Sequence, residues 1–157
     1  MTKLNSYLSL IRFYNPIGFW LLLWPGLWGL FLSDNFNIEN FTIVVLGSFL
    51  TRSLGCAIND FLDKDFDKSV ERTKNRPIAS KELSLSEAGI FIILLASFCI
   101  FLLMQTNPYT IKLVSYVAIP MIIFYPLMKR YLAMPQLFLG ATFGLSLPIS
   151  YSIAEST

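Results

Sequence analysis

The amino-acid sequence predicts an all-α integral membrane protein with about five transmembrane helices. Hydrophobic residues make up 55% of the 157 residues and charged residues only 14%, whereas soluble domains contain about 25% charged residues. Five apolar stretches are long enough, or nearly so, to cross a hydrocarbon core that requires about 20 helical residues. These stretches are residues 16–32, 41–58, 88–104, 111–128 and 135–153.

The first stretch is expected to be a retained helix rather than a signal peptide. Pro16 follows Asn15, and proline is favoured at the first position of a helix. The stretch ends at Ser33-Asp34-Asn35 without a small-residue cleavage pattern, and further apolar stretches follow it. Pro25 lies inside it, where a membrane helix tolerates a kink.

Local signals also delimit the later helices. Ser84 and Glu87 have the spacing of a capping box, which predicts the start of the third helix. Asn107-Pro108 marks its end. Pro120 and Pro148 fall inside the fourth and fifth stretches and predict kinks there.

Basic residues indicate the orientation of the chain. If the five helices alternate in direction from a cytoplasmic N-terminus, the polar loop 59–87 is cytoplasmic. Most of the lysines and arginines then lie on the cytoplasmic side, as the positive-inside rule expects. Lys112 lies on the outer side, and Arg52 falls within the second helix.

Composition also excludes several classes of function. The two cysteines, Cys56 and Cys99, lie in apolar runs and form no disulfide framework. The chain has no histidine, which excludes a Ser-His-Asp triad and a histidine-ligated zinc site. The net charge of +2 is too small to indicate nucleic-acid binding.

The loop 59–87 contains most of the acidic residues and carries the candidate chemistry. If the second helix continues into the loop at about 100° per residue, one face of about 100° of arc gathers several polar side chains and Asp65 points away. Carboxylates on one face repel one another unless a cation lies between them, and oxygen ligands suit Mg²⁺. The residues that share the face are Arg52, Asn59, Asp60, Asp63 and Asp67.

These acids and the basic residues after them suggest a magnesium-dependent diphosphate site at a membrane helix end, with a lipid tail on the diphosphate. The alternative is a solvated loop whose charges only set the topology. Arg52 favours the site, because an arginine within a membrane helix usually faces a cavity or a partner. Its structural alternative is a salt bridge to Asp60 or Asp63, or a side chain that reaches the interface.

The motif Asn59-Asp60-x-x-Asp63-x-x-x-Asp67, followed by Arg72-Thr73-x-x-Arg76-Pro77, resembles the first aspartate motif of the UbiA family of intramembrane prenyltransferases. Further stretches most resemble the branch that prenylates 4-hydroxybenzoate. They are Pro16-Ile17-Gly18, Leu23-Trp24-Pro25-x-Leu27-Trp28, and Tyr125-Pro126-x-Met128-Lys129-Arg130-Tyr131, which leads to Pro135-Gln136 and Leu139-Gly140.

The resemblance implies a nine-helix membrane bundle, of which residues 1–157 form the N-terminal part. It implies that polyprenyl diphosphate binds through Mg²⁺ and that the ring of 4-hydroxybenzoate attacks the resulting allylic cation, a step of ubiquinone biosynthesis. It assigns Asn59, Asp60, Asp63 and Asp67 to the metal, with Asp63 and Asp67 as the main catalytic ligands. Arg72, Arg76, Lys129 and Arg130 match diphosphate-binding positions, while Arg52 and Arg12 are candidates for the acceptor's carboxylate and Tyr125 for the cation.

The sequence departs from the family in its acidic residues. No aspartate follows Asp67, so the second aspartate motif of the family is missing, and Glu155 is the only acid after Glu87. We therefore expect an N-terminal half that is inactive alone, or that needs its missing half or self-association. The alternatives are a non-catalytic membrane fragment that binds a cation or lipid diphosphate, and a sister prenyltransferase with another acceptor. The expected location is the bacterial inner membrane.

Overall fold

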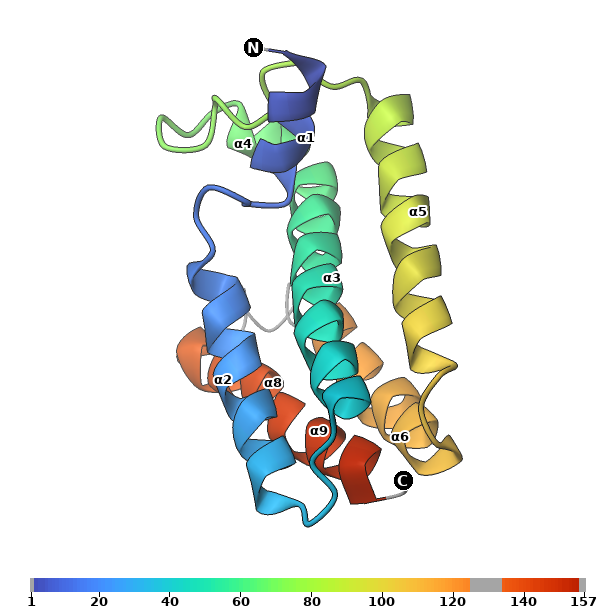
Figure 1. Cartoon of the computed structure of the whole chain (residues 1–157). Coiled ribbons are helices and arrows are strands. Elements are labelled where there is room, and N and C mark those ends of the chain that lie inside the picture. Colours follow the sequence, from blue (N-terminus) through green and yellow to red (C-terminus); the bar gives the residue numbers. More distant parts are fainter. Residues whose placement is uncertain (1, 125–133, 156–157) are drawn as a thin grey trace. The chain divides into compact units, whose positions relative to one another are not determined.

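The computed structural model describes residues 2–124 and 134–155, and these residues form helices and turns without a strand (Figure 1). The helices lie where the sequence analysis expects them, with one addition at the N-terminus. They are α1 Lys3–Leu10, α2 Ile17–Leu32, α3 Ile38–Leu62, α4 Lys64–Asp67, α5 Leu85–Leu103, α6 Pro108–Leu113, the π-helix η1 Val114–Ala118, α8 Pro135–Gly144 and α9 Ser146–Glu155.

Three of the apolar helices are long enough to cross a membrane. They span Ile38–Leu62, Leu85–Leu103 and Gln136–Glu155, with 25, 19 and 20 residues. Ile17–Leu32 and Pro108–Phe124 are shorter apolar helices. The five helical segments correspond to the five predicted stretches, which confirms the all-α membrane fold.

α3 is longer than a hydrocarbon core requires. At about 1.5 Å per residue, its 25 residues extend about 37 Å, compared with a core about 30 Å thick. The predicted stretch ends at Ile58, whereas the helix continues to Leu62 and includes Asn59 and Asp60. The helix itself therefore carries the first polar residues of the motif.

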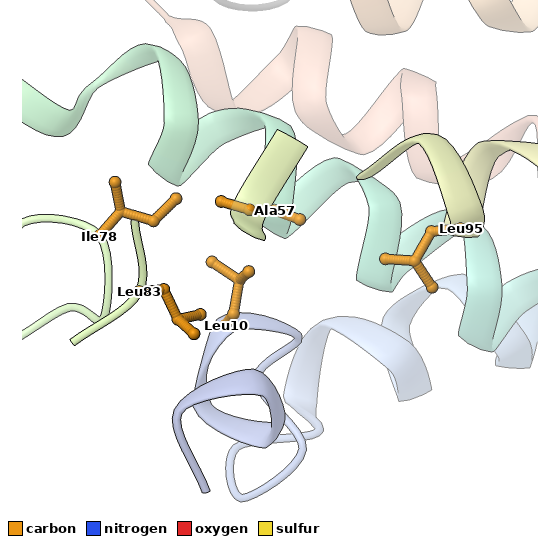
Figure 2. Packing of buried hydrophobic residues seen from close by; sticks show 6 residues of the cluster. Leu10, Ala57, Ile78, Leu83 and Leu95 are labelled. Carbon is orange, nitrogen blue, oxygen red and sulfur yellow. The ribbon is translucent and has the colours of Figure 1, made fainter. Parts of the chain in front are cut away.

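The chain divides into two compact units. The first unit comprises Met1–Gly18 and Leu50–Ile100. Its core is a cluster of buried side chains from α1, α3, α5 and the loop after α4 (Figure 2). The members of this cluster are Leu10, Ala57, Ile78, Leu83, Ala88 and Leu95.

The second unit comprises Phe19–Phe49 and Phe101–Thr157, and its buried cluster contains Leu23, Leu30, Val44, Ile153 and Ala154. Gly29 allows close packing in this unit, because a Cβ atom there would lie 2.2 Å from the carbonyl oxygen of Leu147. Within Pro108–Phe124, η1 precedes Pro120. A π-helical turn accommodates the missing N–H and the ring of a proline.

The predicted capping box is present at the start of α5. Glu87 accepts hydrogen bonds from the backbone N–H and the hydroxyl of Ser84, both at 2.9 Å, and its own N–H donates to the Ser84 hydroxyl. Lys3 forms an ion pair with the same Glu87, and Ser6 donates to Glu82 at 2.7 Å. The capping segment therefore also anchors α1.

α1 ends in a Schellman motif. The N–H of Phe13 donates to the carbonyl of Leu8 at 2.9 Å, and the N–H of Arg12 donates to that of Ser9 at 3.1 Å. Arg12 occupies the left-handed position of the motif, with φ of 59°. The turn places the Arg12 side chain beside the end of α3, where the candidate site lies.

Candidate active site at the end of α3

The backbone of α3 and α4 sets the spacing of the aspartate motif. The N–H of Asp63 donates to the carbonyl of Asn59 at 2.9 Å, and the N–H of Asp67 donates to that of Asp63 at 2.8 Å. These bonds preserve a helical spacing of four residues across the break between α3 and α4. The predicted continuation of the helix is confirmed as far as Leu62, and beyond it the chain breaks at Asp63 before the short helix α4.

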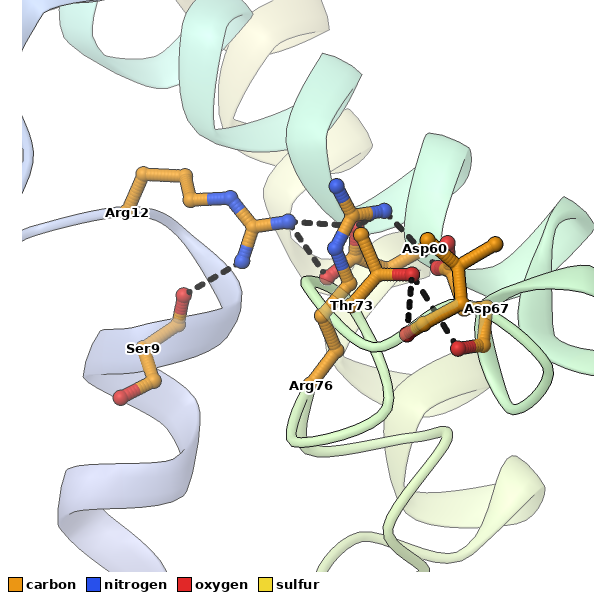
Figure 3. Close-up of polar contacts among 7 residues, drawn as sticks. Ser9, Arg12, Asp60, Asp67, Thr73 and Arg76 are labelled. Carbon is orange, nitrogen blue, oxygen red and sulfur yellow. Dashed lines mark hydrogen bonds and ion pairs between the residues drawn. The ribbon is translucent and has the colours of Figure 1, made fainter.

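Asp60 is the most buried acid of the motif, with 1% of its side chain exposed. Nη2 of Arg12 donates to both carboxylate oxygens of Asp60, at 2.7 and 2.9 Å. Nη1 of Arg12 donates to the carbonyl of Ser9 at 3.2 Å, which holds the guanidinium against the end of α1. The pair therefore connects α1 to α3 (Figure 3).

Arg76 connects two acids of the motif. Its Nη1 lies 3.1 Å from Oδ1 of Asp60 and 2.8 Å from Oδ2 of Asp67. Thr73, which is buried beside Asp67, donates its hydroxyl to the Asp67 carbonyl at 3.1 Å (Figure 3). Arg12, Asp60, Arg76 and Asp67 form a chain of alternating charges, which we call the charge chain.

The charge chain neutralises the two buried carboxylates. A buried acid without a partner is strongly destabilising, because its ionised form loses hydration that nothing replaces. The sequence analysis expected a cation between the carboxylates, and the guanidinium groups of Arg12 and Arg76 occupy such positions for Asp60 and Asp67. Asn59 and Asp63 are half-buried.

A basic cavity of about 340 Å³ lies beside the charge chain. Its lining combines three arginines with hydroxyl and amide groups and contains no acid. The lining residues are Ser9, Arg12, Tyr14, Asn15, Arg72, Thr73, Asn75, Arg76 and Pro77. Guanidinium groups recognise phosphate through paired N–H donors, so the cavity suits a phosphorylated anion.

Arg52 lies within α3 and is half-buried. No ion pair to Arg52 occurs in the ranges that the structure describes, so the predicted alternative of a salt bridge to Asp60 or Asp63 is wrong. Both arginines that pair with Asp60 come from other segments. The guanidinium of Arg52 instead packs over Gly18, where a Cβ atom would lie 2.1 Å from Nε.

The remaining predicted residues are peripheral or outside the described ranges. Arg72 is exposed and lines the cavity. Asp65 is exposed as predicted, and its hydrogen bond from Lys68 holds the pKa of Asp65 below its ordinary value. Tyr125, Lys129 and Arg130 lie outside the described residues.

The oxygen atoms of the motif are suitable ligands for a hard divalent cation. Asn59, Asp63 and Asp67 offer only amide and carboxylate oxygens, the ligands that Mg²⁺ prefers. Over the described ranges, no three acidic, cysteine or histidine side chains already form a metal cage. Mg²⁺ often binds through one or two carboxylates together with substrate phosphates, so a preformed cage is not required.

The sequence analysis missed three features of the site. α1 was not predicted, although Tyr7, Leu10 and Ile11 have the i, i+3, i+4 spacing of a buried helix face, and all three pack in the first unit. The roles of Ser9 and Thr73 depend on hydrogen bonds to backbone carbonyls. No sequence spacing reveals those bonds, because every residue type carries the same backbone carbonyl.

Comparisons with known proteins agree with the geometry. The family model described as the UbiA prenyltransferase family matches residues 22–157. The 4-hydroxybenzoate octaprenyltransferase of Polynucleobacter asymbioticus is 43% identical over 152 residues, which is 96% of this chain and 53% of that protein. The 4-hydroxybenzoate octaprenyltransferase of Photobacterium profundum is 46% identical over 156 residues, which is 97% of this chain and 53% of that protein.

A solved structure gives the same result for the fold. It is described by the words "Structural and mechanistic insights into the biosynthesis of Digeranylgeranylglyceryl phosphate synthase in membranes". It matches with a TM-score of 0.78 and 26% identity, over 96% of this chain and 53% of that one. The chain spans about half the length of the relatives it matches. It belongs to the UbiA prenyltransferase family.

Proposed function

We propose that this chain takes part in the transfer of a polyprenyl group from polyprenyl diphosphate to the ring of 4-hydroxybenzoate, a step of ubiquinone biosynthesis. The observation that carries the proposal is the basic cavity beside the motif from Asn59 to Asp67. A cavity with three arginines and no acid in its lining suits the diphosphate. The names of the relatives support the acceptor.

Asn59, Asp63 and Asp67 would hold a magnesium ion in this proposal. When bound, Mg²⁺ would neutralise charge on the departing diphosphate. Arg72 and Arg76 would contact the diphosphate from the cavity side, and Lys129 and Arg130 are proposed to do so from beyond the described ranges. Each of these groups stabilises the charge that develops on the leaving oxygen.

The acceptor is proposed to bind near Arg52. The guanidinium of Arg52 is free of acidic partners in the part of the chain that the structure describes, so it can pair with the carboxylate of 4-hydroxybenzoate. Arg12 is the second candidate for that carboxylate, but its Nη2 donates to Asp60, so the acceptor role is proposed for Arg52 alone. Tyr125 is proposed to face the allylic cation through its ring.

The membrane setting follows from the three spans and the family. We propose the bacterial inner membrane, with the N-terminus and the loop 59–87 on the cytoplasmic side. In that orientation the cavity faces the compartment from which a charged aromatic acid arrives. The polyprenyl tail remains in the bilayer.

A transfer assay tests the proposal. Membranes of cells that lack their own enzyme and produce this protein would receive labelled polyprenyl diphosphate, 4-hydroxybenzoate and Mg²⁺. In a full-length enzyme that contains this chain, we expect prenylated product, a loss of at least 100-fold in Asp63→Asn, and activity within twofold in the matched control Asp65→Asn. The chain alone is expected to give product only if a partner or self-association completes the site. Chelation of Mg²⁺ is expected to stop the reaction.

Three outcomes would each contradict a part of the proposal. Equal turnover in Asp63→Asn and the unaltered protein would remove Asp63 from the metal site. No product from the full-length enzyme, when it is present in the membrane, would mean that the proposed transfer does not occur. Product with another aromatic acceptor, and none with 4-hydroxybenzoate, would replace the proposed acceptor.

A further inference from the structure

Asp60 and Asp67 are both buried and paired with arginine, but Asp60 is the more completely engaged of the two. Its side chain is 1% exposed, and both of its oxygens are already engaged by Arg12. Oδ1 also lies 3.1 Å from Nη1 of Arg76. Asp60 is not among the residues that line the basic cavity, whereas both of its arginine partners are. The carboxylate therefore lies behind the cavity wall and holds two groups that form it.

The backbone at Arg12 indicates that its side chain is required. Arg12 has φ of 59°, in the left-handed region where glycine is favoured and other residues are strained. An arginine at this position is unfavourable for the backbone. The compensating contacts are the two hydrogen bonds to Asp60 and the one to the Ser9 carbonyl.

The charges around Asp60 also indicate that Arg12 and Arg76 depend on its carboxylate. Arg12 and Arg76 lie close to one anionic group, and without it their like charges would repel across the cavity wall. An ion that replaced the guanidinium groups at Asp60 would have to break hydrogen bonds that are largely buried. Asp63, by contrast, forms no side-chain ion pair within the described part of the chain and is half-buried.

We propose that Asp60 is a positioning residue that holds the guanidinium groups of Arg12 and Arg76 at the cavity wall, where they meet the diphosphate of the substrate, and that it is not a metal ligand. The inference rests on the proposed function. It leaves Asn59, Asp63 and Asp67 as the proposed ligands, with one oxygen of Asp67 held by Arg76, and it makes Asp60 a support. Arg12 then contacts the donor substrate rather than the acceptor.

A binding measurement separates the two roles of the aspartates. Farnesyl thiodiphosphate, an unreactive analogue of the donor, would be titrated against purified protein in EDTA and again in Mg²⁺. We expect Asp60→Asn to raise the Kd about tenfold in both conditions, because it disorganises the guanidinium groups. We expect Asp63→Asn to raise the Kd only in Mg²⁺, and Asp65→Asn to leave both values within twofold.

A double-mutant cycle tests whether the two residues act together. It adds the variants Arg12→Gln and Asp60→Asn/Arg12→Gln to Asp60→Asn. If Asp60 acts through Arg12, the double variant binds about as weakly as the weaker single variant. If the Kd of the double variant rises by the product of the two single-variant increases, the two residues act independently, and the positioning role is overturned. An Asp60→Asn protein that keeps the unaltered Kd in EDTA and loses only the Mg²⁺-dependent gain in affinity would overturn it as well.

Arg12→Gly provides a test if Asp60→Asn does not fold. Glycine relieves the left-handed backbone and removes the guanidinium, while Arg76 remains beside Asp60. We expect the Kd in EDTA to rise about tenfold, measured on protein whose thermal unfolding shows that it is folded. An unchanged Kd in Arg12→Gly would overturn the inference. If the unaltered protein binds the analogue in neither condition, the proposed function fails together with the inference. Binding that is equal in all variants overturns the inference alone.

Discussion

At Arg12, an unfavourable backbone conformation is offset by favourable hydrogen bonds of the side chain. A left-handed conformation costs a non-glycine residue about 1–2 kcal/mol, and Arg12 adopts it at the end of α1. Hydrogen bonds to charged groups contribute about 1.5–3 kcal/mol each, and Arg12 makes two with Asp60. The side-chain contacts therefore outweigh the strain and fix the position of the turn.

Gly18 is predicted to control the position of Arg52. In Gly18→Ala the new methyl group would lie 2.1 Å from Nε of Arg52, so the guanidinium must move. If Arg52 binds the acceptor, the KM for 4-hydroxybenzoate rises about fivefold or more while the KM for polyprenyl diphosphate stays within twofold. Steady-state kinetics in membranes measure both constants.

Gly55→Ala is the matched control for this prediction. Gly55 lies on α3 like Arg52, and a Cβ atom there meets nothing within 4 Å. Both KM values should remain unchanged in this variant. If the KM for 4-hydroxybenzoate is the same in Gly18→Ala and Gly55→Ala, Arg52 does not bind the acceptor.

The residues of the site were only partly predictable from the sequence. Helical spacing predicts Asn59, Asp63 and Asp67 on one face, and the backbone hydrogen bonds from Asp63 to Asn59 and from Asp67 to Asp63 keep that spacing. The partners of Asp60 could not be found in this way, because Arg12 and Arg76 are 48 and 16 positions away from it along the chain. Their approach depends on the turn after α1 and on the loop after α4.

Among the helices, α2 and α9 depend on the absence of a side chain at Gly29. A Cβ atom there would lie 2.2 Å from the Leu147 carbonyl oxygen and from the Ser150 hydroxyl. Because one of these atoms is backbone, the helices themselves must shift in Gly29→Ala. We expect a loss of about 1–3 kcal/mol in the free energy of unfolding, measured by thermal or denaturant unfolding in detergent.

Gly144→Ala is expected to behave in the opposite way. Gly144 lies on α8, and a Cβ atom there meets nothing within 4 Å. Replacement of a helical glycine by alanine stabilises a helix by up to about 1 kcal/mol. An equal loss of stability in the two variants would refute the close packing at Gly29.

Hydropathy and capping signals were sufficient to predict the membrane helices, because these signals act within one segment. Ser84 and Glu87 cap α5 as their spacing requires. The length of α3 was underestimated at both ends, since polar residues such as Asn59 remain helical when backbone hydrogen bonds continue. α1 was missed because it is too short and too polar to resemble a span.

The orientation of the whole molecule is testable by chemical labelling. Ser69 and Asp34 are exposed and lie on opposite sides of the membrane in the proposed topology. In Ser69→Cys, a membrane-impermeant maleimide is expected to react only after the cells are opened. In Asp34→Cys it is expected to react with intact cells.

The unaltered protein is the control for these labels, because Cys56 is buried and Cys99 half-buried. Reaction of Ser69→Cys in intact cells would reverse the proposed orientation. It would also place the basic cavity on the outer side, away from cytoplasmic substrates.

The anchoring of α1 has a consequence for biosynthesis. The pairs Arg12–Asp60, Ser6–Glu82 and Lys3–Glu87 join residues 48, 76 and 84 positions apart. A ribosome makes α1 before its partners, and the last of them emerges only when α5 begins. α1 therefore waits while α2 and α3 insert, and its docking, which assembles two of the guanidinium groups of the cavity, is a late event in the maturation of the protein.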